Sequence, residues 1–174
     1  MKIIIFGAAG SGTTTLGKSI SNKLGWKHLD VDDYYWEKTT PPFQIKIDLE
    51  KRNANLKADY SKFEHVIISG SLVSWGSFWH SAFDLAVFSR IPQSIRMERL
   101  QKRESERYGN ELFTNQQIKT NSKLFLEWAE KYDDENFTGR SISVHRDWME
   151  ALSCEVVKLE GCLLYTSPSP RDRG

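Results

Sequence analysis

The sequence predicts an α/β fold in which a five-stranded parallel sheet lies between two layers of helices. Three observations support this prediction: short apolar runs alternate with segments of helical periodicity, a glycine-rich loop joins the first apolar run to the first helical segment, and neither an internal repeat nor a linker divides the chain. Strands that alternate with helices form right-handed βαβ units, which assemble into a parallel sheet. We therefore expect one three-layer domain over residues 1–161.

The expected strands are short and apolar. Residues 2–6 (KIIIF) are almost continuously apolar, which is typical of a strand covered on both faces of a parallel sheet. The other expected strands are residues 28–31, 65–69, 85–88 and 155–159. Helical segments are expected at residues 14–24, 48–60, 92–108, 114–132 and 146–152. In the first helix, Leu16, Ile20 and Leu24 recur at helical spacing. Gly25 marks its end, because glycine is favoured just past the last turn.

The glycine-rich loop, G-A-A-G-S-G-T-T over residues 7–14, follows the first strand directly and opens the first helix. It fits the phosphate-binding pattern G-x-x-x-x-G-K-[ST] except that Thr13 stands in the lysine position. Glycines let several backbone N–H groups converge on one anion, and the helix N-terminus adds partial positive charge. We expect ATP phosphates to bind at Gly7, Gly10, Ser11, Gly12, Thr13, Thr14 and Thr15. The Thr14 hydroxyl is the expected Mg²⁺ ligand; a tight turn capped by threonine is the structural alternative.

The missing lysine has a chemical consequence. Lysine in this position offsets the charge of the β- and γ-phosphates, whereas Thr13 can donate only a neutral, weaker hydrogen bond. Arginines from elsewhere in the chain must therefore supply positive charge if phosphoryl transfer occurs.

Further motifs run through residues 2–161: GAAGSGTTTLG, DVDDYYW, PPF, SGS-x-x-x-WG, R-x-x-R-x-x-x-R, GRS-x-x-x-H and V-x-KLEG. With these motifs the chain resembles bacterial P-loop proteins of the adenylate kinase-like group, also described as AAA-family ATPases and related to shikimate kinases. The GSGTTT loop is similar to that of archaeal-type cytidylate kinases. The resemblance implies a P-loop NTPase fold of the nucleoside and nucleotide kinase type, in which a lysine-free loop still binds nucleotide.

An acidic cluster follows the second expected strand in the segment HLDVDDYYW. Ligands of open α/β sheets bind beyond the carboxyl ends of the strands, so Asp32 and Asp33 should lie near the phosphates. Continued strand alternation would place Asp32 on the side of Asp30, with Asp33 on the other. Asp30-x-Asp32 resembles the motif that binds Mg²⁺ and orients the acceptor hydroxyl in shikimate- and gluconate-type kinases. We expect Asp32 in the metal shell and Asp33 at the acceptor, with the reverse order open; a capping polar strand end is the structural alternative.

Aromatic and hydroxyl side chains near the same sheet edge are candidates for the acceptor site. The candidates are Tyr34, Tyr35, Trp36, Ser71 and Trp75, with Trp79 beside them. Aromatic faces can stack on an acceptor, but core packing is the alternative for the tryptophans and for one or two of the three consecutive aromatics.

Arginines at positions 96, 99, 103 and 107 share one face of a helix. A solvated face balanced by glutamates is the structural interpretation. The resemblance implies instead that Arg99, Arg103 and Arg140 approach the transferred phosphate and stabilise charge in the transition state, with a short lid within residues 104–140, over 108–113. His145 is expected to be structural.

These observations favour an ATP-dependent, Mg²⁺-assisted kinase that phosphorylates a nucleotide, nucleoside or small hydroxyl metabolite. A nucleotide-binding regulatory module or weak ATPase is the alternative that the missing lysine favours. The net charge of +1 gives no reason to expect nucleic acid or a membrane as a partner, and no apolar run has the length of a membrane helix. Two cysteines indicate neither a disulfide framework nor a metal site, so we expect a cytoplasmic protein. The oligomeric state stays open.

The last residues, 162–174, differ sharply in composition from the rest of the chain. Residues 162–172 resemble a translated sequencing-library adapter. We therefore expect residues 162–174 to be a non-native tail, and the natural sequence of this domain to continue only to about Gly161 before it is interrupted.

Overall fold

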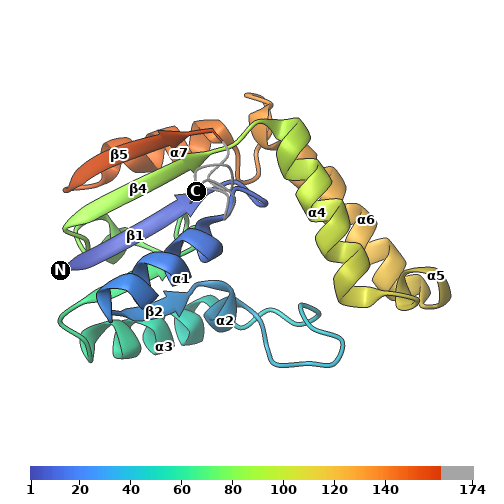
Figure 1. Cartoon of the computed structure of the whole chain (residues 1–174), viewed down its shortest axis with the longest axis horizontal. Coiled ribbons are helices and arrows are strands. Elements are labelled where there is room, and N and C mark those ends of the chain that lie inside the picture. Colours follow the sequence, from blue (N-terminus) through green and yellow to red (C-terminus); the bar gives the residue numbers. More distant parts are fainter. Residues whose placement is uncertain (162–174) are drawn as a thin grey trace, which may run out of the picture.

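Five parallel strands form one sheet in the computed structural model of the chain (Figure 1), which describes residues 1–161. The adapter-like segment lies outside the described residues. The order across the sheet is β2-β3-β1-β4-β5. The strands are β1 (Lys2–Gly7), β2 (Lys27–Asp30), β3 (Val66–Ser69), β4 (Leu85–Arg90) and β5 (Glu155–Glu160). The predicted five-stranded parallel sheet is confirmed.

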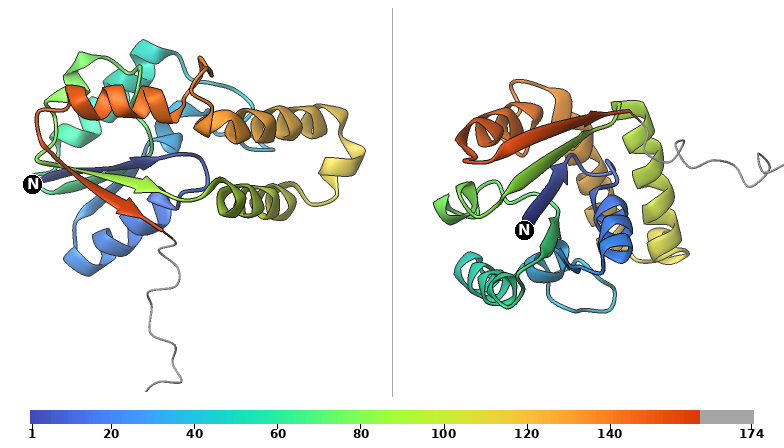
Figure 2. Two further views of the ribbon diagram at one scale, coloured as in Figure 1. Left: turned by 90° about the horizontal axis from the view of Figure 1, so that it is seen from above. Right: turned by 60° about the vertical axis from the view of Figure 1, so that its left-hand side comes forward.

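Both faces of the sheet are covered, which explains the continuous apolar runs of its central strands. Ile4 and Phe6 of β1 pack into a core on one face, and Ile3 and Ile5 pack into a second core on the other. Helix α1 (Thr13–Leu24) covers the second core, while α3 (Leu49–Ser61) and α7 (Ile142–Ala151) cover the first (Figure 2). The predicted three layers are therefore present.

A helical hairpin projects beyond the carboxyl ends of the strands (Figure 1). It consists of α4 (Gln93–Tyr108), α5 (Glu111–Thr114) and α6 (Gln116–Glu130). The segment expected as a short lid, 108–113, lies at the far tip of this hairpin. The helix expected over 114–132 corresponds to α6 and starts two residues later, because the Asn115 side chain caps it by accepting hydrogen bonds from the backbone N–H groups of Gln117 and Ile118. The turn η2 (Lys131–Asp133) follows α6.

The chain turns into a short helix, α2 (Asp32–Tyr35), directly after β2. The Asp30 side chain accepts a hydrogen bond from the Asp32 N–H at 3.0 Å, and the N–H of Tyr35 bonds back to the Val31 carbonyl. The expected alternation of side chains through Asp33 is therefore wrong, because these local hydrogen bonds end the strand at Asp30.

Two smaller features complete the fold. A 3₁₀ turn, η1 (Ser77–His80), lies between β3 and β4. Helix α7 begins four residues before the expected position, at Ile142, because the Ser141 hydroxyl caps it by accepting from the Val144 N–H at 3.3 Å. In the part of the chain that the structure describes, no helix combines the length and apolar character needed to span a membrane.

Candidate active site

The glycine-rich loop curls between β1 and α1 at the carboxyl edge of the sheet. Gly10 and Gly12 have φ angles of 80° and 84°, in the left-handed region that favours glycine. Among the described residues, no side chain caps α1, and its first turn holds no acidic residue. The first N–H groups of an α-helix have no intrahelical partner. Those of Thr13, Thr14 and Thr15 are thus available to an anion, which the helix dipole also favours.

Neighbouring backbone fixes the position of this loop. A Cβ atom on Gly7 would collide with the Ser89 carbonyl oxygen of β4, and one on Gly10 would lie 2.9 Å from the Arg96 carbonyl oxygen of α4. The Ser89 hydroxyl also donates to the Ser11 carbonyl at 3.1 Å. The loop is therefore held in one conformation by β4 and α4, which is the preorganisation that phosphate binding requires.

The first two arginines of α4 contact the loop in different ways. Arg96 is 1% exposed, pairs with Asp133 at 2.8 Å, and donates to the Ala9 carbonyl at 3.4 Å. Arg99 donates to the Gly10 carbonyl at 3.4 Å, and its Nη1 atom is 4.0 Å from the place that a Cβ on Gly12 would occupy. Arg96 thus anchors α4 to the loop, whereas Arg99 brings a guanidinium group to its edge.

Asp32 lies among arginines that come from two separate segments. Desolvation by the surrounding residues raises the pKa of its carboxyl group, and the charge of Asp30 raises this pKa further. The guanidinium groups of Arg140, Arg103 and Arg107 act in the opposite direction. Asp33, which is exposed like Asp32, instead neighbours Tyr34 and His28 electrostatically. The two adjacent aspartates therefore face different surroundings, and Asp32 is the one that faces the arginines.

A cavity of about 310 Å³ opens beside this charged cluster. It brings together side chains from distant parts of the sequence: Tyr35, Ser71, Trp75 and Arg140, which the sequence indicated, and Arg52, which it did not. Desolvation lowers the pKa of the Arg140 guanidinium, while the Asp32 carboxylate raises it. Arg140 thus connects the cavity with Asp32.

Arg52 is the residue that sequence reasoning missed. Its guanidinium carbon lies 4.3 Å from the ring centroid of Tyr35 and 4.7 Å from that of Trp75. Its Nε atom is buried and finds no hydrogen-bond partner among the described residues. Arg52 also lines the cavity, so its guanidinium group is suited to an anionic ligand bound there. The one local signal is the place of Arg52 in the first turn of the helix after the aromatic segment.

Three aromatic residues proposed for the acceptor site point elsewhere. The Tyr34 hydroxyl donates to Asp59 of α3 at 2.7 Å, and Trp36 packs against Phe43 with ring centroids 6.0 Å apart. Trp79 is fully buried in the core and donates to the Asn53 side chain. Of these candidates, neither Tyr34 nor Trp36 lines the cavity. Successive side chains of a helix such as α2 differ in direction by about 100°, which sends consecutive aromatics to different neighbours.

Comparison with known proteins places the chain in a family. No protein-family model matches it. The chain is 45% identical over 158 residues to the uncharacterized protein YqaC of Bacillus subtilis (strain 168), an alignment that covers 91% of this chain and 87% of YqaC. The chain belongs to the YqaC family.

More distant relatives of this YqaC-family chain are kinases. It is 28% identical over 118 residues to a cytidylate kinase of Sulfolobus acidocaldarius, which covers 60% of this chain and 62% of that enzyme. A segment of 35 residues is 49% identical to a probable gluconokinase of Rattus norvegicus, about a fifth of each chain (20% and 19%).

Solved structures of similar fold are kinases as well. Shikimate kinase from Bacteroides thetaiotaomicron has a TM-score of 0.47 at 18% identity, with 86% of this chain and 97% of that chain covered. Deoxyadenosine kinase from M. mycoides with bound dATP has a TM-score of 0.46 at 18% identity, with 91% of each chain covered.

The YqaC-family chain offers few ligands for a metal. Among the described residues, no group of three or more His, Cys, Asp or Glu side chains is arranged to hold an ion. A group of that kind is not required for Mg²⁺ bound with a nucleotide, which is usually held by one or two carboxylates together with substrate phosphates and water. Thr14 and the Asp30–Asp32 pair are the residues that can contribute.

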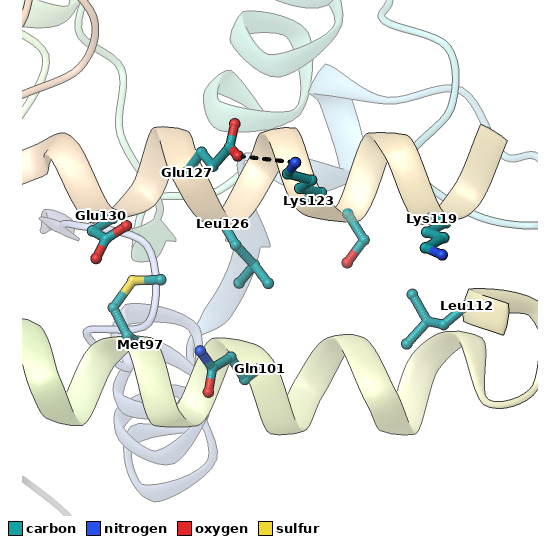
Figure 3. Close-up of a pocket in the computed structure, with 9 residues that line it drawn as sticks. Met97, Gln101, Leu112, Lys119, Lys123, Leu126, Glu127 and Glu130 are labelled. Carbon is teal, nitrogen blue, oxygen red and sulfur yellow. Dashed lines mark ion pairs between the residues drawn. The ribbon is translucent and has the colours of Figure 1, made fainter. Parts of the chain in front are cut away.

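A larger cavity, of about 370 Å³, lies between α4 and α6 of the hairpin (Figure 3). Its walls include Met97, Gln101 and Leu126, and an ion pair of 3.7 Å joins Lys123 to Glu127 on α6. None of the site residues expected from the sequence lines this cavity. We therefore assign the candidate active site to the loop, Asp32 and the smaller cavity.

Proposed function

We propose that this protein is a small-molecule kinase that transfers the γ-phosphoryl group of ATP to an acceptor bearing an anionic group. The observation that carries this proposal is the position of Asp32. Its electrostatic neighbours include Arg140, which lines the cavity, and Arg103 of α4, the helix whose Arg96 and Arg99 contact the glycine-rich loop. This carboxylate is therefore coupled electrostatically both to the helix that contacts the glycine-rich loop and to the pocket.

The loop supports nucleotide binding by its backbone. The unpaired N–H groups at the start of α1 and the left-handed glycines before it suit the β- and γ-phosphates of ATP. Bound Mg²⁺ would neutralise phosphate charge, and the Thr14 hydroxyl with the Asp30 carboxylate would hold it. Arg99, at the loop edge, supplies the charge that Thr13 lacks.

Asp32 is the residue we assign to the acceptor hydroxyl, the role that the sequence analysis gave to Asp33. Its raised pKa suits a group that accepts a proton from an attacking hydroxyl. Arg103 and Arg140 then stabilise the charge that develops on the transferred phosphoryl group. Asp33 has no part in this assignment, because its neighbours lie away from the arginines.

Arg52 and the aromatic rings of Tyr35 and Trp75 support binding of the acceptor. A planar guanidinium stacked on aromatic faces is held in one orientation, which favours paired hydrogen bonds to a carboxylate or phosphate. The anionic group of the acceptor would lie at Arg52 and Arg140, with its hydroxyl toward Asp32.

The test is ADP release from Mg-ATP by the full chain over a panel of acceptors: nucleoside monophosphates, nucleosides, shikimate and gluconate. We expect at least one anionic acceptor to raise turnover. Arg52→Ala should raise the KM for that acceptor roughly 10- to 100-fold, because a charge-assisted hydrogen bond is lost. The KM for ATP should not change. The matched control is Lys51→Ala, which removes an exposed cation next to Arg52 on α3.

A nucleotide-binding regulatory module is the second candidate, and the threonine at position 13 favours it. This alternative predicts that ATP binds, that no acceptor raises turnover, and that Asp32→Asn leaves any basal ATPase rate unchanged. That combination of results would replace the kinase proposal, and absence of nucleotide binding would contradict both functions.

A further inference from the structure

A buried chain of hydrogen bonds lies beneath the acceptor cavity and is not used by the proposed function. Ser71, 5% exposed, lines the cavity, and its Oγ atom lies 2.9 Å from Nε2 of His145. The other ring nitrogen, Nδ1, lies 2.7 Å from the hydroxyl of Tyr132. His145 is fully buried, with its ring 5.4 Å from that of Phe6 and 5.9 Å from that of Phe88.

The sequence around this histidine links the chain of hydrogen bonds to the cavity. His145 is the last residue of the motif GRS-x-x-x-H, and Arg140 of the same motif lines the cavity. Ser141, between them, caps α7 and accepts from the Val144 N–H. One helix start therefore fixes both the cavity arginine and the histidine that contacts Ser71.

The direction of the hydrogen bonds follows from the Tyr132 hydroxyl. A neutral imidazole ring has one donor nitrogen and one acceptor nitrogen. Tyr132 is buried, and within residues 1–161 the hydrogen of its hydroxyl has only Nδ1 of His145 as an acceptor. A hydrogen on Nδ1 would leave that hydroxyl hydrogen buried and unpaired, which is costly. Tyr132 therefore donates to Nδ1, and Nε2 of His145 carries the hydrogen that it donates to Ser71.

The pKa shifts of Tyr132 and His145 agree with this arrangement. Burial raises the pKa of the Tyr132 hydroxyl, so the hydroxyl keeps its hydrogen. Burial and the nearby Arg140 lower the pKa of His145 to about 3, so the ring is neutral near pH 7. Each hydroxyl and each ring nitrogen then has one defined role.

We infer that His145 is a positioning residue that holds Ser71 as a hydrogen-bond donor toward the anionic group of the acceptor. Because Ser71 Oγ accepts from His145, its own hydrogen must find another partner, and the cavity is the open side. Ser71, Arg52 and Arg140 then all present donors to a ligand. Such a cavity selects a carboxylate or phosphate, which accepts hydrogen bonds, over an amide of the same shape. The inference rests on the proposed function for the identity of this cavity as the acceptor site.

The first test is the tautomer of His145, read by NMR on the full chain labelled with ¹⁵N in histidine. The signal is assigned from its absence in His145→Gln. We expect a hydrogen on Nε2 and none on Nδ1 at pH 7. Tyr132→Phe removes the hydroxyl that fixes this choice, so a mixture of the two tautomers should appear. A hydrogen on Nδ1 in the wild-type protein would overturn the inference.

The second test measures binding of benzoate and of its neutral analogue benzamide to the full chain, with the loop saturated by Mg-ADP. The fluorescence of Trp75 and Trp128, which line the cavity, reports binding. We expect benzoate to bind more tightly than benzamide. Ser71→Ala and His145→Asn should each lower the affinity for benzoate about tenfold, because each variant loses one hydrogen bond to a charged group.

His145→Gln is the matched variant, because its amide N–H can reach the place of Nε2, whereas the shorter amide of asparagine replaces only Nδ1. Glutamine should keep benzoate affinity within about threefold of wild type. If His145 had a purely structural role, His145→Gln and His145→Asn would lose benzoate affinity equally, and that result would overturn the inference. So would equal binding of benzoate and benzamide, or no benzoate binding by the wild-type protein.

These outcomes separate the two proposals. If the tautomer and the benzoate affinities are as expected but no acceptor is turned over, the inference on Ser71 and His145 is supported and the proposed kinase function is contradicted. Turnover of an acceptor, together with benzoate binding that neither Ser71→Ala nor His145→Asn weakens, would support the kinase proposal and contradict the inference. If the His145 variants fail to fold, the signal that changes in Tyr132→Phe identifies His145, so the wild-type spectrum still tests the inference.

Discussion

At the residue scale, the two left-handed glycines of the phosphate loop have nearly the same backbone conformation but different surroundings. Gly10 packs against the backbone of α4, whereas the space beside Gly12 is open toward Arg99. The conformation of each is needed for the loop to curl, but only Gly10 is also needed for the close approach of another element. Substitution can therefore separate the cost of conformation from the cost of packing.

We predict that Gly12→Ala lowers the free energy of unfolding by about 1–2 kcal/mol, the cost of a left-handed residue with a side chain. Gly10→Ala should cost at least about 1 kcal/mol more, because its Cβ would lie 2.9 Å from the Arg96 carbonyl oxygen. Urea unfolding measures both. Gly25→Ala, with φ of 69° and open space at the end of α1, is the control and should match Gly12→Ala. Equal losses at positions 10 and 12 would show that α4 yields to the added methyl group.

At the element scale, one buried arginine attaches the helical hairpin to the rest of the molecule. Arg96 donates to the Ile91 carbonyl before α4, to the Ala129 carbonyl at the end of α6, and to the Ala9 carbonyl of the loop. Its ion pair with Asp133 completes this set. Because these partners belong to separate elements, Arg96 fixes where α4 and its other arginines lie relative to the phosphate loop.

We predict that Arg96→Met lowers the free energy of unfolding by about 3 kcal/mol, since it leaves Asp133 and several carbonyl groups without their donor. Asp133→Asn should cost about 1 kcal/mol, because the amide oxygen can still accept from Arg96. Lys102→Met removes an exposed cation of α4 and should change stability by less than about 0.5 kcal/mol. Denaturant unfolding of the three variants checks this order, and a small loss for Arg96→Met would contradict the anchoring role.

The elements differ in how far the sequence predicted them. The strands were predicted within about two residues, because apolar runs reflect burial on both faces of a sheet. The boundaries at Asn115 and Ser141 depend on single capping side chains, which are local signals that apolar periodicity does not contain. The turn of α2 depends on the Asp30 side chain in the same way.

At the scale of the whole molecule, the candidate site is assembled from the carboxyl ends of strands and from segments that follow them. The motifs predicted that Tyr35, Ser71, Trp75 and Arg140 belong to one site, because the sheet edge collects such segments. Arg52 escaped prediction because its one local signal, a place in the first turn of a polar helix, is shared with the neighbouring cation Lys51. Its significance arises only when folding buries it between two aromatic rings.

The global stability of the protein should depend on pH through His145. Its pKa is lowered to about 3 by burial and by Arg140, whereas an ordinary histidine has a pKa of about 6.5. Between these values the unfolded chain binds a proton that the folded chain excludes, so the free energy of unfolding falls as pH falls below about 6.5. The contribution of this one residue is up to about 1.4 kcal/mol per pH unit.

We therefore predict that the stability advantage of the wild-type protein over His145→Gln, whose side chain does not titrate, shrinks by roughly 2–3 kcal/mol between pH 7 and pH 4.5. Urea unfolding at a series of pH values measures the two curves. Other titrating groups, including Asp59, whose pKa is lowered by Lys62 and Tyr34, act equally on both proteins and cancel in the difference. Ser71→Ala keeps His145 and should retain the wild-type dependence on pH. Parallel curves for wild type and His145→Gln would mean that the folded protein accepts a proton on His145, and the hydrogen-bond directions inferred for Tyr132 and Ser71 would then fail as well.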